Sequence, residues 1–345
     1  MKLISRLLPL VALVSLCGFA QTPVTKAPVV LVSQTPLPDI VGDFDHFAID
    51  LKRNHLFVYA EVHHSVEVFD LRTGVHLQSL GGFSTPHSLA FSPEKDQLMV
   101  CDGGTSELVL VSAASLQPTA HIALISGAAT GKGDSPDAAF YDPATRLYYI
   151  GNGGVSAGMA TSKISIFSVD QGRLMGDFEV PGNNIESIGV DDTHQRLYVN
   201  IRDKKQVGVF DLATRQMLTT WTAPDMNRNT ALLVDKENQR IFVAGRSPGT
   251  LYVFNQESKV VAQLPCAENN DDMSFDPKTK LLYVSGSQGL SIFHQNTPDS
   301  YTELTRIPTN GGKTSALAPS VGKLFVIHPK TDVDSAGLLV YELSR

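Results

Sequence analysis

Polar residues that suit ligand or metal binding stand directly before short apolar runs at several places in the chain. The set comprises Asp45, His46, His87, Asp137, Glu186, Asn229, Asp271, Asp272 and Lys313. Carboxylates, an amide and imidazoles that converge in space can hold a hard cation through oxygen or orient a polar ligand. They can equally bind only water and satisfy loop amides. The choice between these roles depends on the elements that carry the residues.

A second set of mostly basic side chains follows other apolar runs. It comprises His64, Arg202, Arg246 and His328. Because loops on one face of a rigid scaffold commonly carry binding residues, we expect this set to form an outer layer of contacts around the first.

The apolar runs belong to a pattern that occurs seven times. In each unit an aliphatic residue is followed by an aromatic or apolar residue and then by a β-branched or apolar one. The segments are Leu56–Val58, Leu98–Val100, Leu147–Tyr149, Leu197–Val199, Ile241–Val243, Leu282–Val284 and Leu324–Val326. Their spacing of about 41 to 50 residues is the period of a four-stranded propeller blade. The sequence therefore predicts an all-β fold, a seven-bladed β-propeller of four-stranded antiparallel blades.

The seventh unit lacks its fourth strand. Only residues 342–345 follow Tyr341, whereas an unpaired apolar segment, Val29–Val32, lies near the N-terminus. We predict that this N-terminal strand completes the last blade, so that no long sheet edge is exposed. In such a ring the loops before the innermost strands meet at the mouth of the central channel. The first set of polar residues is therefore expected to face one hollow there.

Several segments resemble YVTN-type propeller repeats. They include the units around Arg196–Asn200 and Leu282–Ser285, and strands such as Val207–Asp211. From residue 21 onward the chain resembles the secreted bacterial YncE-like group of that superfamily, also at Phe44–Asp50 and Asn270–Met273. The resemblance implies the propeller fold. It leaves the function open, because the superfamily includes binding proteins, surface-layer proteins and a few enzymes.

Two functions compete on this basis. The first is an exported, non-enzymatic binding module whose channel-mouth site takes a small polar ligand, a glycan, a metal or a protein partner. The second is a metal-dependent hydrolase of the lactonase kind, since propeller lactonases hold a divalent ion with the residue types that Glu186, Asn229 and Asp272 offer here. A cation such as Ca²⁺ would polarise an ester carbonyl and His46 would move protons. Quinoprotein-like electron transfer ranks last, because no haem-attachment pattern occurs.

The N-terminus has the features of an export signal. Lys2 and Arg6 precede the apolar stretch Leu7–Leu16, which is too short to span a bilayer. Gly18–Ala20 places small residues at the positions that a signal peptidase reads. We expect a signal peptide over residues 1–20, cleavage near Ala20, one propeller domain over residues 21–345, and a periplasmic or secreted protein with no transmembrane segment.

The remaining composition limits the partners. The formal net charge is -7 and no basic run occurs, so a nucleic-acid partner is not expected. Cys101 and Cys266 fall in units far apart in the ring, so we expect no disulfide between them.

Overall fold

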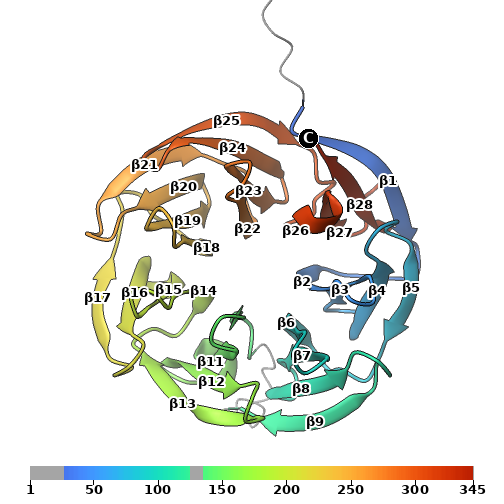
Figure 1. The fold of residues 1–345 in the computed structure, drawn as a ribbon, viewed down its shortest axis with the longest axis horizontal. Coiled ribbons are helices and arrows are strands. Elements are labelled where there is room, and N and C mark those ends of the chain that lie inside the picture. The colour runs from blue at the N-terminus through green and yellow to red at the C-terminus, as the bar shows by residue number, and fades with distance from the viewer. Residues whose placement is uncertain (1–26, 125–134, 345) are drawn as a thin grey trace, which may run out of the picture.

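The computed structural model describes residues 27–124 and 135–344, so the expected signal peptide lies outside the described residues. Within these ranges the strands form seven four-stranded antiparallel sheets, arranged as blades around a central axis (Figure 1). The predicted fold class, a seven-bladed β-propeller, is confirmed. None of the helices in the described ranges is long and apolar enough to cross a bilayer.

In six blades the strands run outward from the axis in chain order. Blade 1 consists of β2 (Phe44–Asp50), β3 (His55–Ala60), β4 (Ser65–Asp70) and β5 (His76–Leu80). Blade 2 consists of β6 (Pro86–Ser92), β7 (Gln97–Asp102), β8 (Glu107–Ser112) and β9 (Pro118–Ala123). Blade 3 consists of β10 (Ala139–Asp142), β11 (Leu147–Gly153), β12 (Ser162–Ser168) and β13 (Arg173–Val180). Blade 4 consists of β14 (Ile185–Asp191), β15 (Arg196–Ile201), β16 (Gln206–Asp211) and β17 (Met217–Trp221). Blade 5 consists of β18 (Asn229–Asp235), β19 (Arg240–Arg246), β20 (Gly249–Phe254) and β21 (Val260–Pro265). Blade 6 consists of β22 (Asn270–Asp276), β23 (Leu281–Gly286), β24 (Gly289–Thr297) and β25 (Ser300–Ile307). Short 3-10 helices lie at η2 (Val155–Ala157), η3 (Arg202–Lys204) and η4 (Pro319–Val321).

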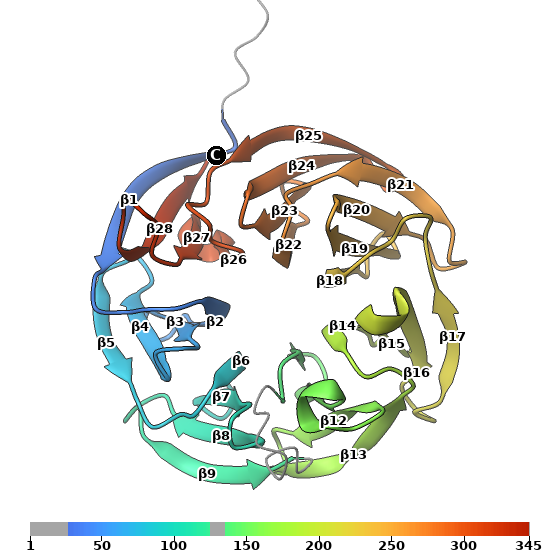
Figure 2. The same ribbon diagram turned by 180° about the vertical axis from the view of Figure 1, so that it is seen from behind.

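The seventh blade joins the two ends of the chain. It consists of β26 (Thr314–Ala318), β27 (Lys323–His328), β28 (Ala336–Leu343) and, outermost, β1 (Val29–Leu37). β1 pairs antiparallel with β28, from Val29 opposite Leu343 to Leu37 opposite Ala336. Both face-on views show β1 along the outside of β28 (Figure 2). The predicted closure by the N-terminal strand is therefore confirmed.

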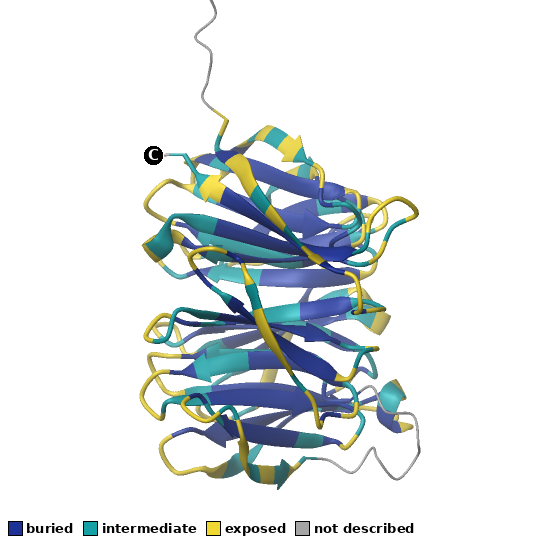
Figure 3. Ribbon diagram, turned by 90° about the vertical axis from the view of Figure 1, so that its right-hand side faces the viewer, coloured by how far each residue is buried: buried dark blue, intermediate teal, exposed yellow. Residues whose placement is uncertain are grey.

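The core lies between the blades. Seven hydrophobic clusters each combine side chains from two neighbouring blades; one contains Tyr59 and Val66 of blade 1 with Leu98 and Val100 of blade 2. This follows from strand geometry, because successive side chains point to opposite faces and so supply the cluster on either side of the blade. Burial is concentrated in the middle of the strands, and the exposed residues gather in the loops at both faces of the disc (Figure 3). Cys101 and Cys266 are buried and unbridged, as expected.

The innermost strands are irregular where they face the channel mouth. Five of the seven pairs between a blade's first and second strand have a register shift at that end. The shifts lie between Phe44 and Phe47, Pro86 and Leu89, Ile185 and Ile188, Asn229 and Leu232, and Asn270 and Asp272. A β-bulge leaves a residue unpaired and re-aims its side chain. The bulges therefore create positions from which side chains can leave the sheet and enter the channel.

Candidate functional site

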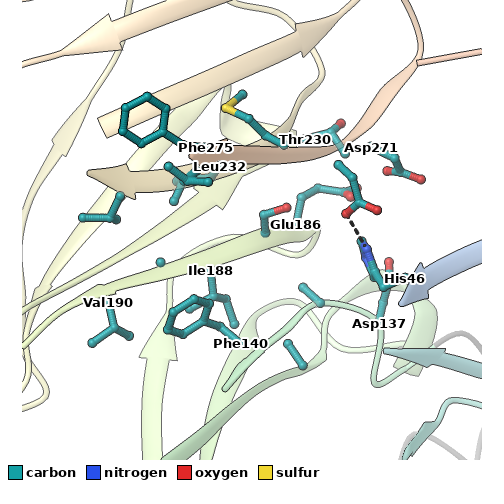
Figure 4. A pocket seen from close by; sticks show the side chains of 18 of the residues that line it. His46, Asp137, Phe140, Glu186, Ile188, Val190, Thr230, Leu232, Asp271 and Phe275 are labelled. Atoms are coloured by element: carbon teal, nitrogen blue, oxygen red, sulfur yellow. Dashed lines mark hydrogen bonds and ion pairs between the residues drawn. The ribbon is translucent and has the colours of Figure 1, made fainter. Parts of the chain in front are cut away.

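A cavity of about 620 Å³ lies at the channel mouth and extends along the inner strands β10, β14, β18 and β22. Its two parts differ in character. Charged residues such as His46, Asp137 and Asp271 lie on one side, and the apolar side chains of Phe140, Ile188, Val190, Leu232 and Phe275 lie on the other (Figure 4). The cavity can therefore accept a ligand with a charged head and an apolar body.

The structure brings eight of the nine channel-mouth residues together around this cavity. They are Asp45, His46, His87, Asp137, Glu186, Asp271, Asp272 and Lys313. The bulges explain the convergence, because Asp45, His87, Glu186 and Asp271 each follow the first residue of a bulge. Four blades thus project an unpaired side chain from the same repeat position.

Asn229 is the exception, because it does not line the cavity. It is the first residue of its bulge, like Phe44 in blade 1, and it is fully buried. Its Nδ2 donates to Oδ1 of Asn200 at 2.9 Å and to the backbone oxygen of Gln206 at 3.0 Å. The next residue, Thr230, lines the cavity instead. The expected metal set of Glu186, Asn229 and Asp272 is consequently not assembled.

The second set divides evenly. Arg202 and Arg246 line the cavity and contact its carboxylates directly, so they are not an outer layer. His64 is exposed and its Nδ1 contacts the backbone oxygen of Ser84. His328 is buried, with Nδ1 2.9 Å from the backbone oxygen of Pro329. Neither histidine lines the cavity.

Glu61 lines the cavity but was not expected there. It stands five residues after Leu56, just as Arg202 stands five after Leu197 and Arg246 five after Ile241. Because strand side chains alternate, residues at this fifth position share one direction, whereas His328, four residues after Leu324, points the other way. Aligning the repeats at this position would have found Glu61 and excluded His328.

The four permanent cations of the cavity are already paired. Lys236 binds Asp192. Arg202 binds Glu186, and Arg246 binds Asp271. Nζ of Lys313 lies 2.9 Å from Oδ2 of Asp271 and 3.0 Å from Oδ2 of Asp43. These pairs stabilise the walls of the cavity and leave no lysine or arginine paired with Asp45, Glu61 or Asp137 within the described residues.

Two histidines bridge the remaining carboxylates. Nδ1 of His46 lies 2.8 Å from Oδ1 of Asp272, and its Nε2 lies 3.6 Å from Oδ1 of Asp45. The backbone N–H of Ser315 donates to the other oxygen of Asp272 at 3.1 Å. His87 stands between Asp45 and Asp137, with Nδ1 at 3.6 and 3.9 Å from their oxygens. The carboxylates of blades 1, 3 and 6 are thereby joined across the channel.

The carboxylates raise the pKa values of their neighbours. Burial would lower the pKa of His46, but the charges of Asp45 and Asp272 raise it well above the ordinary value of 6.5. Burial is outweighed in the same way at His87, where Asp45 and Asp137 raise the pKa to about 9. Burial also raises the pKa of Asp137, which lies near the charge of Asp45. The site therefore takes up protons to offset its negative charge.

Glu186 gives this electrostatic arrangement a measurable pH dependence. Burial and the charge of Asp137 outweigh Arg202 and raise the pKa of Glu186 from 4.5 to about 7. Between these values the folded protein holds a proton that the unfolded chain has lost, so stability falls as the pH rises. We predict that Glu186 lowers the free energy of unfolding of the unmodified protein by on the order of 2–3 kcal/mol between pH 4.5 and 7. In Glu186→Gln this decrease should be absent. Urea unfolding of both proteins across this range tests it; parallel pH profiles would show that Glu186 titrates normally.

Comparison with known proteins supports the fold and no activity. No family model matches the chain, and no curated protein matches it. Among solved structures, the chain is similar to one titled Kuenenia stuttgartiensis Hydrazine Synthase, with a TM-score of 0.69 and 16% sequence identity, over 86% of this chain and 97% of that chain. At that identity the likeness shows a shared architecture, and a shared architecture does not carry function with it. The chain is a seven-bladed β-propeller, and its function has to be inferred from the cavity.

Proposed function

We propose that this protein is a non-enzymatic binding module whose central cavity takes a small ligand with a cationic head and an apolar body. The propeller fold supports a binding or interaction role in general. The repeat units around Arg196–Asn200 support membership of the YVTN-type superfamily, and Lys2, Arg6 and Leu7–Leu16 support action after export. Both of these are part of the proposal.

The excess of carboxylates in the cavity carries the proposal. Eight carboxylates line it, against four permanent cations that are already paired. The carboxylates are Asp45, Glu61, Asp137, Glu186, Asp235, Glu237, Asp271 and Asp272, and the cations are Arg202, Lys236, Arg246 and Lys313. The histidines and buried acids make up the difference by binding protons. A cationic ligand that displaces these protons gains the same favourable interactions in a water-poor site.

The apolar wall defines the rest of the ligand. Ile188 and Val190 of β14 lie beside Phe140 of β10, and Leu232 and Phe275 extend the wall into blades 5 and 6. Apolar lining with a few convergent charged groups is typical of small-molecule pockets. Burying a hydrocarbon body there contributes about 25 cal/mol for each Å² removed from water.

The hydrolase alternative is not favoured by the geometry. It depended on Glu186, Asn229 and Asp272 sharing an ion, and Asn229 faces away from the cavity. Glu186 is also bound by Arg202, which occupies it as an ion-pair partner.

A cavity-filling variant tests the proposal. Ser187 lines the cavity, so Ser187→Trp should obstruct it without removing a charge. We expect amines such as benzylamine and hexylamine, but not benzoate or hexanoate, to raise the melting temperature of the unmodified protein. A ligand at 100 times its Kd stabilises by about 2.7 kcal/mol. Ser187→Trp should abolish the effect.

Ser300→Trp is the matched control, because Ser300 is exposed at the start of the outer strand β25. It should leave the amine response unchanged. Equal responses to amines and carboxylates, or a response that survives in Ser187→Trp, would remove the cavity as the binding site.

A further inference from the structure

Three side chains from three neighbouring blades have the spacing of metal ligands. One oxygen each of Asp45 and Asp137 and one ring nitrogen of His87 all lie within 4.8 Å of one another. Nδ1 of His87 is 3.6 Å from Asp45 and 3.9 Å from Asp137, which is too long for a good hydrogen bond. A cation placed among such atoms lies roughly 2–2.5 Å from each, the range of metal–ligand bonds.

His87 supplies an independent sign that a partner belongs there. Its side chain is only 8% exposed, and among the described residues Nδ1 reaches no acceptor closer than 3.6 Å. Nε2 is also buried without a hydrogen-bond partner in that part of the chain, but an ion at Nδ1 would not change this. Buried polar groups are normally satisfied, and leaving one unsatisfied costs about 1–3 kcal/mol. Metal binding requires a neutral imidazole with its proton on Nε2, so that the lone pair of Nδ1 points toward an ion held between the two carboxylates.

The backbone around the cluster fixes its spacing. The hydroxyl of Ser88, in the bulge beside His87, donates to the backbone oxygen of Asp137, and the hydroxyl of Tyr59 donates to the backbone oxygen of Ser88. Blades 1, 2 and 3 are thus tied together directly behind the three side chains. A site held by rigid elements needs little rearrangement to bind an ion.

We propose that Asp45, His87 and Asp137 bind one divalent transition-metal ion, such as Zn²⁺ or Mn²⁺. This rests on the proposed function and deepens it, because the ion takes the place of the cationic head at two of the same carboxylates. Imidazole suits transition metals, whereas Ca²⁺ prefers oxygen ligands alone, so the set favours a transition metal over the Ca²⁺ considered from the sequence. Three protein ligands leave coordination positions open toward the cavity, where water or a neutral donor atom completes the shell.

Titration of metal into the chelator-treated protein tests the proposal. We expect one Zn²⁺ or Mn²⁺ per chain by isothermal titration calorimetry, no comparable binding of Mg²⁺, and at least tenfold weaker binding in His87→Gln and Asp137→Asn. His121→Ala is the matched control, because His121 lies in the same blade on the outer strand β9 with its side chain 53% exposed. It should bind metal as the unmodified protein does.

Cobalt substitution gives a second readout that does not depend on affinity alone. Co²⁺ in the unmodified protein should show ligand-field absorption bands that change or disappear in His87→Gln, with near-ultraviolet circular dichroism confirming that the variant is folded. Absence of stoichiometric binding, or binding unchanged in His87→Gln, overturns the metal site. If amines still stabilise the protein in a manner sensitive to Ser187→Trp, the proposed function survives that failure. If they do not, both proposals fall.

Discussion

Replacing Leu37 with alanine should lower the free energy of unfolding by about 3 kcal/mol, the usual cost of a Leu→Ala change in a core. Leu37 is 3% exposed at the end of the closing strand β1. It packs in the cluster between blades 7 and 1, with Phe44 on one side and Leu338 on the other. Because β1 is the outer strand of blade 7, the loss of its packing weakens the closure of the ring.

The same strand contains the control. Leu31 is 50% exposed, so Leu31→Ala should change the free energy of unfolding by less than about 0.5 kcal/mol. Urea denaturation curves of the two variants measure the difference. Equal effects of the two substitutions would mean that β1 does not seal the ring through its buried face.

Replacing Asp271 with alanine should be about as damaging, but for an electrostatic reason. Asp271 holds both Arg246 and Lys313, and its side chain is 8% exposed while theirs are 16% and 21% exposed. Removing it takes the ion-pair partner from Arg246 and leaves Lys313 paired only with Asp43. Breaking a buried pair in this way typically costs about 3–5 kcal/mol. The same change should weaken the binding of amines, because it removes negative charge and frees positive charge.

Two further variants separate charge from packing. Asp170→Ala removes the partner of Arg146 on the surface, where both side chains are 46% exposed. It should lower the free energy of unfolding by less than about 1 kcal/mol. Adding Lys313→Met to Asp271→Ala should restore part of the lost stability, since it removes the second cation that Asp271 held beside Arg246. A double variant no more stable than Asp271→Ala would argue that the loss is one of packing.

The architecture was predictable because it depends on a pattern that repeats. The seven apolar segments, from Leu56–Val58 to Leu324–Val326, all fall in second strands. Closure of the ring by Val29–Val32 followed from counting, since the seventh unit lacked its fourth strand and this N-terminal segment belonged to no unit. Both conclusions need only periodicity and the rule that sheet edges are covered.

The site was harder to predict, because it depends on single-residue register. Asn229 and Thr230 are neighbours, yet Asn229 is buried in the sheet and Thr230 lines the cavity. A shift of one residue reverses the direction of a strand side chain. The bulges that set this register are formed by pairing with the second strand, and nothing in the sequence around Asp45 or Glu186 marks them.

The apolar wall was not predicted for a related reason. Ile188, Val190 and Leu232 belong to first strands, where apolar residues are expected to fill the core between blades. They do pack there, and they also form the wall of the cavity. Which part of a side chain faces the axis depends on how the blades are tilted, and this is a property of the assembled ring.

The position of an iodine-labelled amine in a crystal tests most directly whether the cavity binds a cation with an apolar body. Crystals of the chelator-treated protein, soaked in 4-iodobenzylamine, would be measured for anomalous scattering. We predict an iodine peak between Ile188, Leu232 and Phe275, with the amine directed toward Asp45 and Asp137. Iodine peaks confined to the outer surface of the disc, with only water in the cavity, would contradict the proposal.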